Sequence, residues 1–194
     1  MSQKCIYILD AHPYQASFGP SLVASYEKGA REAGYQVNVV ALRDLDFDPI
    51  LHYGYKQIQD LEPDLQKQQQ YLKDMDHFVI VTPVWWESVP AQLKGFFDRV
   101  LLPGFAFRMK KSRIPSWDKL LTGKSARIIY TQTTPLWYDI CIRKDAFFQS
   151  LKTGTLNFVG IHPVRRTALN VQGADEKRKE GMRNKVYRLG KQGR

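Results

Sequence analysis

The sequence predicts an α/β fold in which a doubly wound, five-stranded parallel sheet carries helices on both faces. Short apolar runs such as CIYIL and HFVIV alternate along the chain with helix-length stretches, the order typical of β–α–β units. Such alternation favours parallel strands that are covered on both faces. No repeat, linker or break in composition divides the 194 residues, so we expect a single domain over residues 1–194.

Proline and glycine mark the boundaries of the predicted elements. Pro20 stands where the first residue of a helix is expected, and Gly34 ends that helix as a C′ glycine would. Pro63 and Pro90 open two further helices, and a basic helix ends the chain. Another helix is expected over 144–152, and a long aromatic and basic loop over 103–121. The five strands are expected at 5–9, 36–42, 77–81, 126–131 and 164–171.

The order of these strands in the sheet can also be predicted. Right-handed crossovers leave few arrangements. Five strands suit the flavodoxin-like order 2-1-3-4-5, in which ligands bind beyond the carboxyl ends of strands one and three. Function is therefore expected in the loops that follow Leu9, Val81 and Thr131, which are also the unusual parts of the sequence.

Composition excludes several classes of protein. The chain has 29 Lys and Arg against 19 Asp and Glu, a net charge of +10, and much of the excess lies in 175–194. We interpret that segment as a solvated helix face, with an anionic partner or dinucleotide phosphates as the alternative. No nucleic-acid-binding motif is present, so we expect no nucleic acid partner. The chain has no apolar run long enough to span a bilayer and no signal peptide, so we expect a cytoplasmic protein without membrane insertion. Two cysteines and four scattered histidines lack ligand spacing, so no metal site is expected.

The first loop, residues 10–20, joins a strand to a helix N-terminus, where free backbone N–H groups bind anions. It has neither the Gly-x-Gly-x-x-Gly fingerprint of dinucleotide-binding folds nor a Walker A motif. His12 and Ser17 could each donate a hydrogen bond to a phosphate oxygen. The alternative is structural, with Ser17 capping the helix and His12 satisfied within a turn.

The second and third loops carry aromatic and polar groups. Trp85 and Trp86 are adjacent, so we expect one to pack into the core and the other to wall the crevice. Packing of both between helices is the alternative. The third loop, residues 131–138, offers hydroxyls, a carboxamide and a phenol that could contact a polar ring edge. This signal is weak alone, because Thr- and Pro-rich turns are common.

The motifs of these loops together resemble one family. Ala11-His12-Pro13 is followed by Ser17-Phe18, then by PVWWESVPAQLKGFFDRV over 83–100 and PGFAF over 103–107. These residues resemble the NAD(P)H:quinone reductases of the flavodoxin-like fold, the family of DT-diaphorase and of the ancillary oxidoreductases of bacterial potassium efflux systems. The resemblance covers nearly the whole chain.

The resemblance implies a homodimer with two active sites at the subunit interface and ping-pong hydride transfer from NAD(P)H, through a bound flavin, to a quinone or related electrophile. The flavin would be FMN or FAD. Its binding residues would come from all three loops: His12, Ser17, Phe18, Pro83, Val84, Trp85, Trp86, Thr131, Gln132, Thr133 and Thr134. The substrate slot would be walled by four side chains, with the two phenylalanines as candidates from the partner subunit: Trp86, Glu87, Phe105 and Phe107. The catalytic candidates would wall the slot or stabilise charge on the reduced flavin: Trp86, Tyr138 and Arg143.

This chain departs from the family pattern at three places. The loop after the fourth predicted strand is shorter than in the animal enzymes, and their Tyr and His have no clear counterparts beyond the candidates Tyr138 and Arg143. Residues 131–134 read Thr-Gln-Thr-Thr where many relatives carry Thr-Thr-Gly-Gly, and Glu87 places an acid where DT-diaphorase has an aromatic residue. An acid beside the slot would disfavour acidic substrates, or it points to solvent. Two other functions stay open: a flavodoxin-like regulatory subunit that docks on a membrane transporter through its basic tail, and a flavin-free scaffold.

Overall fold

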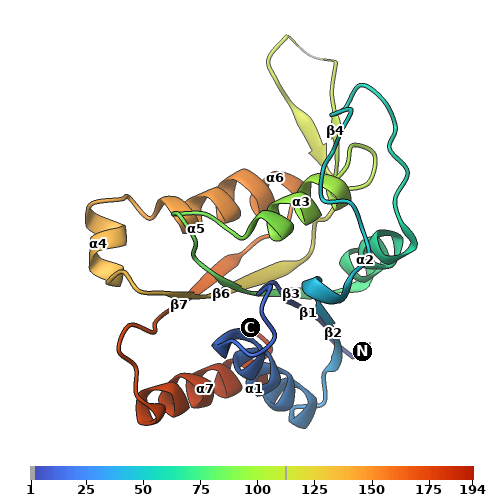
Figure 1. The fold of residues 1–194 in the computed structure, drawn as a ribbon. Coiled ribbons are helices and arrows are strands. Elements are labelled where there is room, and N and C mark those ends of the chain that lie inside the picture. Colours follow the sequence, from blue (N-terminus) through green and yellow to red (C-terminus); the bar gives the residue numbers. More distant parts are fainter. Residues whose placement is uncertain (1–2, 112) are drawn as a thin grey trace.

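A five-stranded parallel sheet runs through the centre of the computed structural model, which describes residues 3–111 and 113–194 (Figure 1). Its strands lie side by side in the order β2-β1-β3-β6-β7, and each neighbouring pair is parallel. Counted along the chain, this is the predicted order 2-1-3-4-5, so the doubly wound, flavodoxin-like topology is confirmed. The strands are β1 (Cys5–Asp10), β2 (Gln36–Ala41), β3 (His77–Pro83), β6 (Ser125–Gln132) and β7 (Val164–Asn170).

Helices cover both faces of the sheet, as predicted (Figure 1). The lower face in that view is covered by α1 (Phe18–Glu32) and α7 (Glu176–Lys191), and the opposite layer includes α2 (Pro63–Asp74) and α3 (Ala91–Val100). Side chains of a strand alternate between the two faces, so β1 contributes to two cores. Ile6 and Ile8 belong to one buried cluster, and Tyr7 and Leu9 to the other.

Two glycines allow α1 and α7 to touch through their backbones. A Cβ on Gly29 would lie 2.2 Å from the carbonyl oxygen of Tyr187, and one on Gly190 would lie 2.1 Å from that of Tyr26. Any other residue would force the helices apart. The basic helix is therefore tightly packed along one side, and on its exposed side Arg183 pairs with Glu176 and with Glu180.

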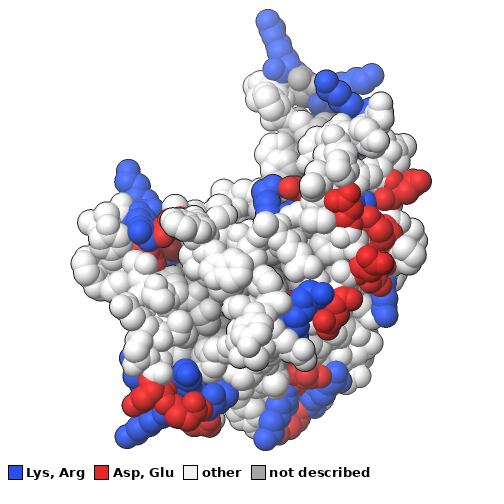
Figure 2. Space-filling view, viewed as in Figure 1, with Lys and Arg blue, Asp and Glu red and all other residues white. Residues whose placement is uncertain are grey.

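Charged side chains on the viewed face gather toward its margins, while the middle of the face is largely uncharged (Figure 2). Lys and Arg mark the tip of the projecting hairpin at the top, and blue and red side chains are mixed along the lower helices. The net charge of +10 is therefore spread over several regions of the surface.

Several predicted boundaries need correction. The first helix begins at Phe18, so Pro20 is its third residue rather than its first. Proline is accepted there because the first N–H groups of a helix have no intrahelical partner. Gly34 does adopt the left-handed conformation expected after the helix, with φ of 83°. The helix expected over 144–152 is instead α5 (Ala146–Gln149), a π-helical segment (Ser150–Leu156) and α6 (Asn157–Val159).

The segment predicted as a loop over 103–121 contains a two-stranded antiparallel hairpin, β4 (Phe107–Met109) and β5 (Trp117–Lys119), which projects from the molecule (Figure 1). Strands of three residues are too short to leave a pattern in the sequence. Two further short elements were not predicted: η1 (Leu42–Asp44) and α4 (Leu136–Cys141). In the described part of the chain, no helix has the length and hydropathy needed to cross a bilayer. Over the same residues, no group of three or more His, Cys, Asp or Glu side chains could hold a metal ion.

Candidate functional site

The three loops singled out in the sequence lie together at the carboxyl edge of the sheet. The backbone N–H of Ala11 donates to the carbonyl of Val81 at 2.8 Å, which joins the first loop to β3. The N–H of Val84 donates to the carbonyl of Thr131 at 2.9 Å, which joins the second loop to the third. The His12 ring meets Trp85 edge-on, with 5.8 Å between ring centroids. The parallel topology predicts this convergence.

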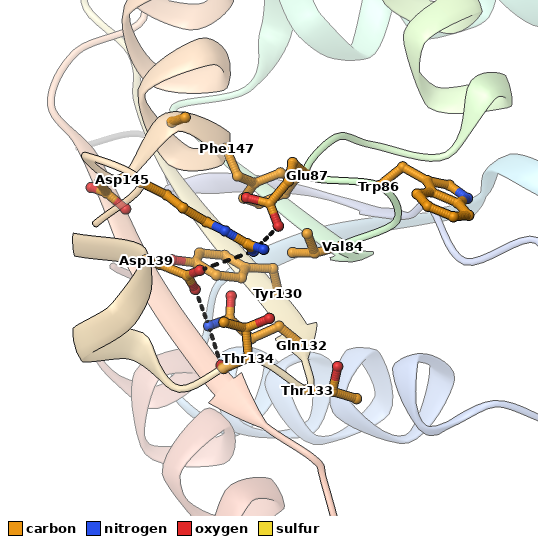
Figure 3. A pocket seen from close by; sticks show the side chains of 12 residues that line it. Val84, Trp86, Glu87, Tyr130, Gln132, Thr133, Thr134, Asp139, Asp145 and Phe147 are labelled. Atoms are coloured by element: carbon orange, nitrogen blue, oxygen red, sulfur yellow. Dashed lines mark hydrogen bonds and ion pairs between the residues drawn. The ribbon is translucent and has the colours of Figure 1, made fainter. Parts of the chain in front are cut away.

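A cavity of about 340 Å³ lies between the second loop, the third loop and the segment that follows (Figure 3). Seven of the predicted site residues line it: Val84, Trp86, Glu87, Gln132, Thr133, Thr134 and Arg143. The sequence analysis missed five others: Tyr130, Asp139, Asp145, Ala146 and Phe147. Tyr130 lies inside a strand and resembles a core residue in the sequence, and Asp139 lies in a six-residue helix that leaves no periodic pattern. Asp145, Ala146 and Phe147 lie at the start of α5, where the sequence predicts a helix but gives no sign of a site. The cavity combines an apolar wall with several charged groups.

The second loop contains a strained turn. Trp85 and Ser88 exchange two backbone hydrogen bonds of 2.9 Å, and Trp86 and Glu87 between them have φ of 51° and 59°. Two-residue turns with both φ values positive normally take Asn or Gly, because other side chains meet their own backbone there. Each such residue costs about 1–3 kcal/mol, and strain of this kind concentrates at functional sites.

The two tryptophans of this turn are not placed as expected. Trp86 is 99% exposed and Trp85 is 45% exposed. The expectation that one of them packs into the core is therefore wrong, and so is the alternative of both packing between helices. The left-handed turn explains this placement, because it points Trp86 away from the sheet and from the polar groups of the cavity (Figure 3).

A network of charged groups fixes Arg143 at the cavity through Glu87 and Asp139, which are labelled in Figure 3. Its Nη1 pairs closely with Oε1 of Glu87 and lies 3.6 Å from Oδ1 of Asp139. Its guanidinium carbon lies 5.1 Å from the centroid of the Tyr138 ring. The Gln132 amide donates to Oδ2 of Asp139 and, at 2.8 Å, to the carbonyl of Thr134. The two catalytic candidates Tyr138 and Arg143 are thus in contact with each other.

Tyr130 and Phe147 form an inner wall of the cavity. Their rings meet at a 62° angle, with centroids 4.9 Å apart. Burial raises the pKa of the Tyr130 phenol to about 12, and the nearby Asp145 carboxylate adds to the rise. Tyr130 is therefore protonated at neutral pH. The negative charge of this Asp145 carboxylate is neutralised by Arg166, whose Nη1 lies 2.7 Å from Oδ2 of Asp145.

The first loop presents unused hydrogen-bond donors at the N-terminus of α1. Ser17 is the N-cap residue, and its Oγ is buried without a hydrogen-bond partner anywhere in residues 3–111 and 113–194. The Nδ1 atom of His12 accepts a hydrogen bond of 3.0 Å from the Tyr14 N–H, so the neutral ring carries its proton on Nε2. Burial lowers the pKa of His12, so the ring is neutral at pH 7. A Cβ on Gly19 would lie 3.6 Å from Ser17 Oγ, inside this space.

These features fit a phosphate group. A helix N-terminus attracts anions through its free N–H groups and its dipole, and the buried hydroxyl of Ser17 needs a partner. Ser17 and His12 are therefore the residues of the first loop that could hold the phosphate of a cofactor. The expectation that Ser17 merely caps the helix is not met, since its side chain makes no capping bond with any described residue.

The three predicted phenylalanines lie away from the cavity. Phe18 packs against the lower core, with the guanidinium carbon of Arg183 5.9 Å from its ring centroid. Phe105 and Phe107 pack against the upper core beside the hairpin. Phe107 also lines a second, largely apolar cavity of about 540 Å³ between α3, the hairpin and α6. The role of Phe105 and Phe107 in a slot shared with a partner subunit stays a prediction.

Comparisons with known proteins agree with this geometry. A model of the family described as "Flavodoxin-like fold" matches residues 4–192. The chain belongs to the flavodoxin-like fold family. Among curated members, the ribosyldihydronicotinamide dehydrogenase [quinone] of Pongo abelii is 30% identical over 94% of this chain and 88% of its own. An uncharacterized NAD(P)H oxidoreductase of Haemophilus influenzae is 34% identical over 52% of each chain, so the match spans about half of that relative.

Solved structures of other proteins share the fold. The NAD(P)H:quinone oxidoreductase from Methanothermobacter marburgensis superposes with a TM-score of 0.80 and 22% identity over 100% of both chains. An FMN-dependent NADH-azoreductase from Bacillus anthracis, solved in complex with FMN, has a TM-score of 0.76 and 17% identity over 98% of this chain and 99% of its own. At these identities the two structures show a common fold.

Proposed function

We propose that this chain is a flavin-dependent NAD(P)H oxidoreductase that reduces quinones or related electrophiles by ping-pong hydride transfer. One observation carries the proposal. The buried Ser17 hydroxyl at the N-terminus of α1, which has no hydrogen-bond partner among the described residues, shares an edge of the sheet with the cavity between the second and third loops. A phosphate donor and a ring-sized cavity at one edge suit a phosphorylated planar cofactor. Relatives named as quinone dehydrogenases and NAD(P)H oxidoreductases support this function.

The flavin would supply the redox chemistry, accepting hydride from NAD(P)H and passing it to the acceptor, while the protein binds and orients the flavin and the two substrates. Ser17, His12 and the free N–H groups of α1 would hold its phosphate. Phe18 would lie beside them. Pro83, Val84, Trp85 and Trp86 would line one edge of the ring, and residues 131–134 the other. The azoreductase bound to FMN shows that the fold accommodates FMN, and both FMN and FAD stay within the proposal.

Residues at the cavity would serve the bound ring and the acceptor. Arg143 is held in place by Glu87 and Asp139, so its positive charge is fixed before any ligand enters. A fixed charge needs no reorganisation to stabilise negative charge that develops nearby. Tyr138 packs against Arg143 and would support it. Trp86, exposed beside the cavity, would form a wall of the acceptor slot.

We also propose that the chain acts as a homodimer, with Phe105 and Phe107 of one subunit closing the slot of the other. The exposure of Trp86, at 99%, is the observation that favours a second subunit, because an apolar wall gains by being covered. Docking on a membrane transporter finds no support, since the named relatives are oxidoreductases. A cytoplasmic location stays a prediction from the sequence.

The absorption spectrum of the purified protein tests the proposal first. We expect the visible absorption bands of an oxidised flavin, on the order of one flavin per chain after reconstitution, and release of FMN or FAD on heating. The loaded protein should oxidise about one equivalent of NADH or NADPH per flavin without an acceptor and should turn over continuously only when a quinone is present. A protein that refuses both flavins, or that binds flavin without acceptor-dependent turnover, would contradict the proposed function.

A further inference from the structure

A buried ion pair lies at the base of the first loop. Asp10 is the last residue of β1 and is 2% exposed, and Arg43 lies in η1, directly after β2. Nη1 of Arg43 lies 2.7 Å from Oδ2 of Asp10. Asp10 ends β1 and Arg43 follows the end of the neighbouring strand β2, so the pair joins the two strand ends at the edge of the sheet that holds the site.

The same pair holds both backbone polar groups of His12. Oδ1 of Asp10 accepts a hydrogen bond of 3.2 Å from the His12 N–H, and Nη1 of Arg43 donates one of 3.2 Å to the His12 carbonyl. The backbone of the first loop is therefore fixed at the residue whose ring faces Trp85. A change at Arg43 would act on the site through this loop.

Asp10 also borders the space that would receive the phosphate. A Cβ built on Gly19 would lie 3.7 Å from Oδ1 of Asp10 and 3.6 Å from Oγ of Ser17. A bare carboxylate at that place would repel an anion, and a buried carboxylate without a partner is costly in itself. The guanidinium of Arg43 offsets both the repulsion of the anion and the cost of burying the carboxylate, because it is always positively charged.

We propose that Arg43 is the positioning residue of the phosphate site: it neutralises Asp10 and holds the His12 carbonyl, so that the first loop accepts the phosphate of a flavin nucleotide. The inference rests on the proposed function, since the anion is the flavin's phosphate. It assigns a role to two residues that the motifs of the family did not point to. It also predicts which part of the ligand senses Arg43: the phosphate, and not the ring.

Riboflavin and FMN separate these two parts, because they share the ring and differ in the phosphate. Their dissociation constants would be measured by fluorescence titration of the flavin-free protein at low salt. We expect Arg43→Met to weaken FMN binding about tenfold or more and to change riboflavin binding less than about twofold, since one unneutralised charge close to an anion is worth on the order of a factor of ten. Arg188→Met, which removes an exposed charge from α7, is the control for net charge and should change neither.

Two variants of Asp10 keep the inference falsifiable if Arg43→Met folds poorly. Asp10→Asn retains the positive charge and removes the negative one, so FMN should bind as tightly as in the unchanged protein or a few-fold more tightly. The double variant Asp10→Asn with Arg43→Met has no unpaired charge, and it should recover most of the lost FMN affinity. Circular dichroism and thermal melting would verify that each variant is folded.

Three results would overturn the inference, and they differ from failure of the proposed function. Equal losses of FMN and riboflavin in Arg43→Met would show a general loosening of the loop. Unchanged FMN binding would remove Arg43 from the site, and weaker FMN binding in Asp10→Asn would contradict the role of charge. If the unchanged protein binds neither FMN, FAD nor riboflavin, the proposed function fails and the inference fails with it.

Discussion

The two edges of the sheet use their polar groups in opposite ways. At the amino edge, where the parallel strands begin, polar side chains bind other groups of the protein. The Asp76 carboxylate accepts from the Cys5 N–H at 2.7 Å, and Lys124 Nζ donates to the carbonyls of Lys73 and Met75. At the carboxyl edge, the buried Ser17 hydroxyl has no partner among the described residues, and Trp86 and Glu87 hold left-handed conformations. The bonds named at the amino edge stabilise the fold, although Nε2 of His77 there also lacks a described partner, whereas the carboxyl edge combines an unpartnered donor with backbone strain.

The largest predicted effect belongs to the amino edge and concerns stability alone. Burial lowers the pKa of His77 to about 3, and Lys4, Arg127 and Arg165 add to this. The unfolded chain has a pKa near 6.5 at this residue, so it binds more protons than the folded chain between pH 6.5 and 3. The free energy of unfolding therefore decreases as the pH falls below 6.5, and the decrease due to His77 reaches roughly 3 kcal/mol at pH 4.

Urea denaturation between pH 7 and pH 4 checks this, with His77→Gln as the comparison. As the pH falls, the free energy of unfolding of the variant should fall less steeply than that of the parent, by up to about 1.4 kcal/mol per pH unit. The reason is that the variant lacks the imidazole that takes up a proton in the unfolded parent chain. Equal slopes in both proteins would remove His77 from the pH dependence. Flavin affinity at pH 7 should be the same in both, since His77 lies at the edge opposite the site.

The next effect belongs to the carboxyl edge and concerns function. Trp86→Ala should weaken flavin binding or turnover by the equivalent of about 2 kcal/mol, the scale on which an aromatic side chain binds a stacked ring. Stability should change by less than about 0.5 kcal/mol, because the side chain is exposed. Ile58→Ala, which removes another exposed apolar side chain, is the control and should alter neither property. Unchanged affinity and rate in Trp86→Ala would take this residue out of the site.

A smaller loss of FMN affinity is expected when the proposed contact to the phosphate is removed. Ser17→Ala should weaken FMN binding by about 1–2 kcal/mol, the worth of one charge-assisted hydrogen bond, and leave riboflavin binding unchanged. The flavin-free variant should be as stable as the parent or slightly more so, because a buried hydroxyl without a described partner is removed. Parallel titrations with the two flavins measure this. Equal FMN affinity in variant and parent would contradict the placement of the phosphate.

The smallest effect sharpens the choice of acceptor. Glu87 is about half exposed and pairs with Arg143 at the cavity. Glu87→Gln should raise kcat/KM for a sulfonated quinone a few-fold relative to an uncharged one, because it removes a negative charge from the entrance. The gain should shrink as salt is added, since salt screens exposed charges. A ratio that does not change between variant and parent would mean that Glu87 faces solvent without influence on the acceptor.

The sequence predicted the features that depend on long patterns. The buried strands, the helix from Pro63 and the convergence of three loops all follow from apolar runs, proline placement and parallel topology. From the motif over 83–100, Val84, Trp86 and Glu87 line the cavity, and their part in binding a ligand stays a prediction.

What the sequence did not reveal depends on contacts between distant residues. Nothing local in Asp10 or Arg43 signals that they pair across two strands, and Asp139 lies in a six-residue helix too short for a periodic pattern. The exposure of Trp86 follows from a left-handed turn that its residue types disfavour. The sequence predicted a core position for one of the tryptophans because two adjacent side chains were expected to face different ways.

A crystal structure of the protein soaked with FMN tests the central claim most directly. We predict a phosphate within hydrogen-bond distance of Ser17 Oγ at the N-terminus of α1, and a ring between the Trp85–Trp86 turn and residues 131–134. FMN bound instead in the apolar cavity lined by Phe107 and Phe158, with the first loop empty, would contradict the account.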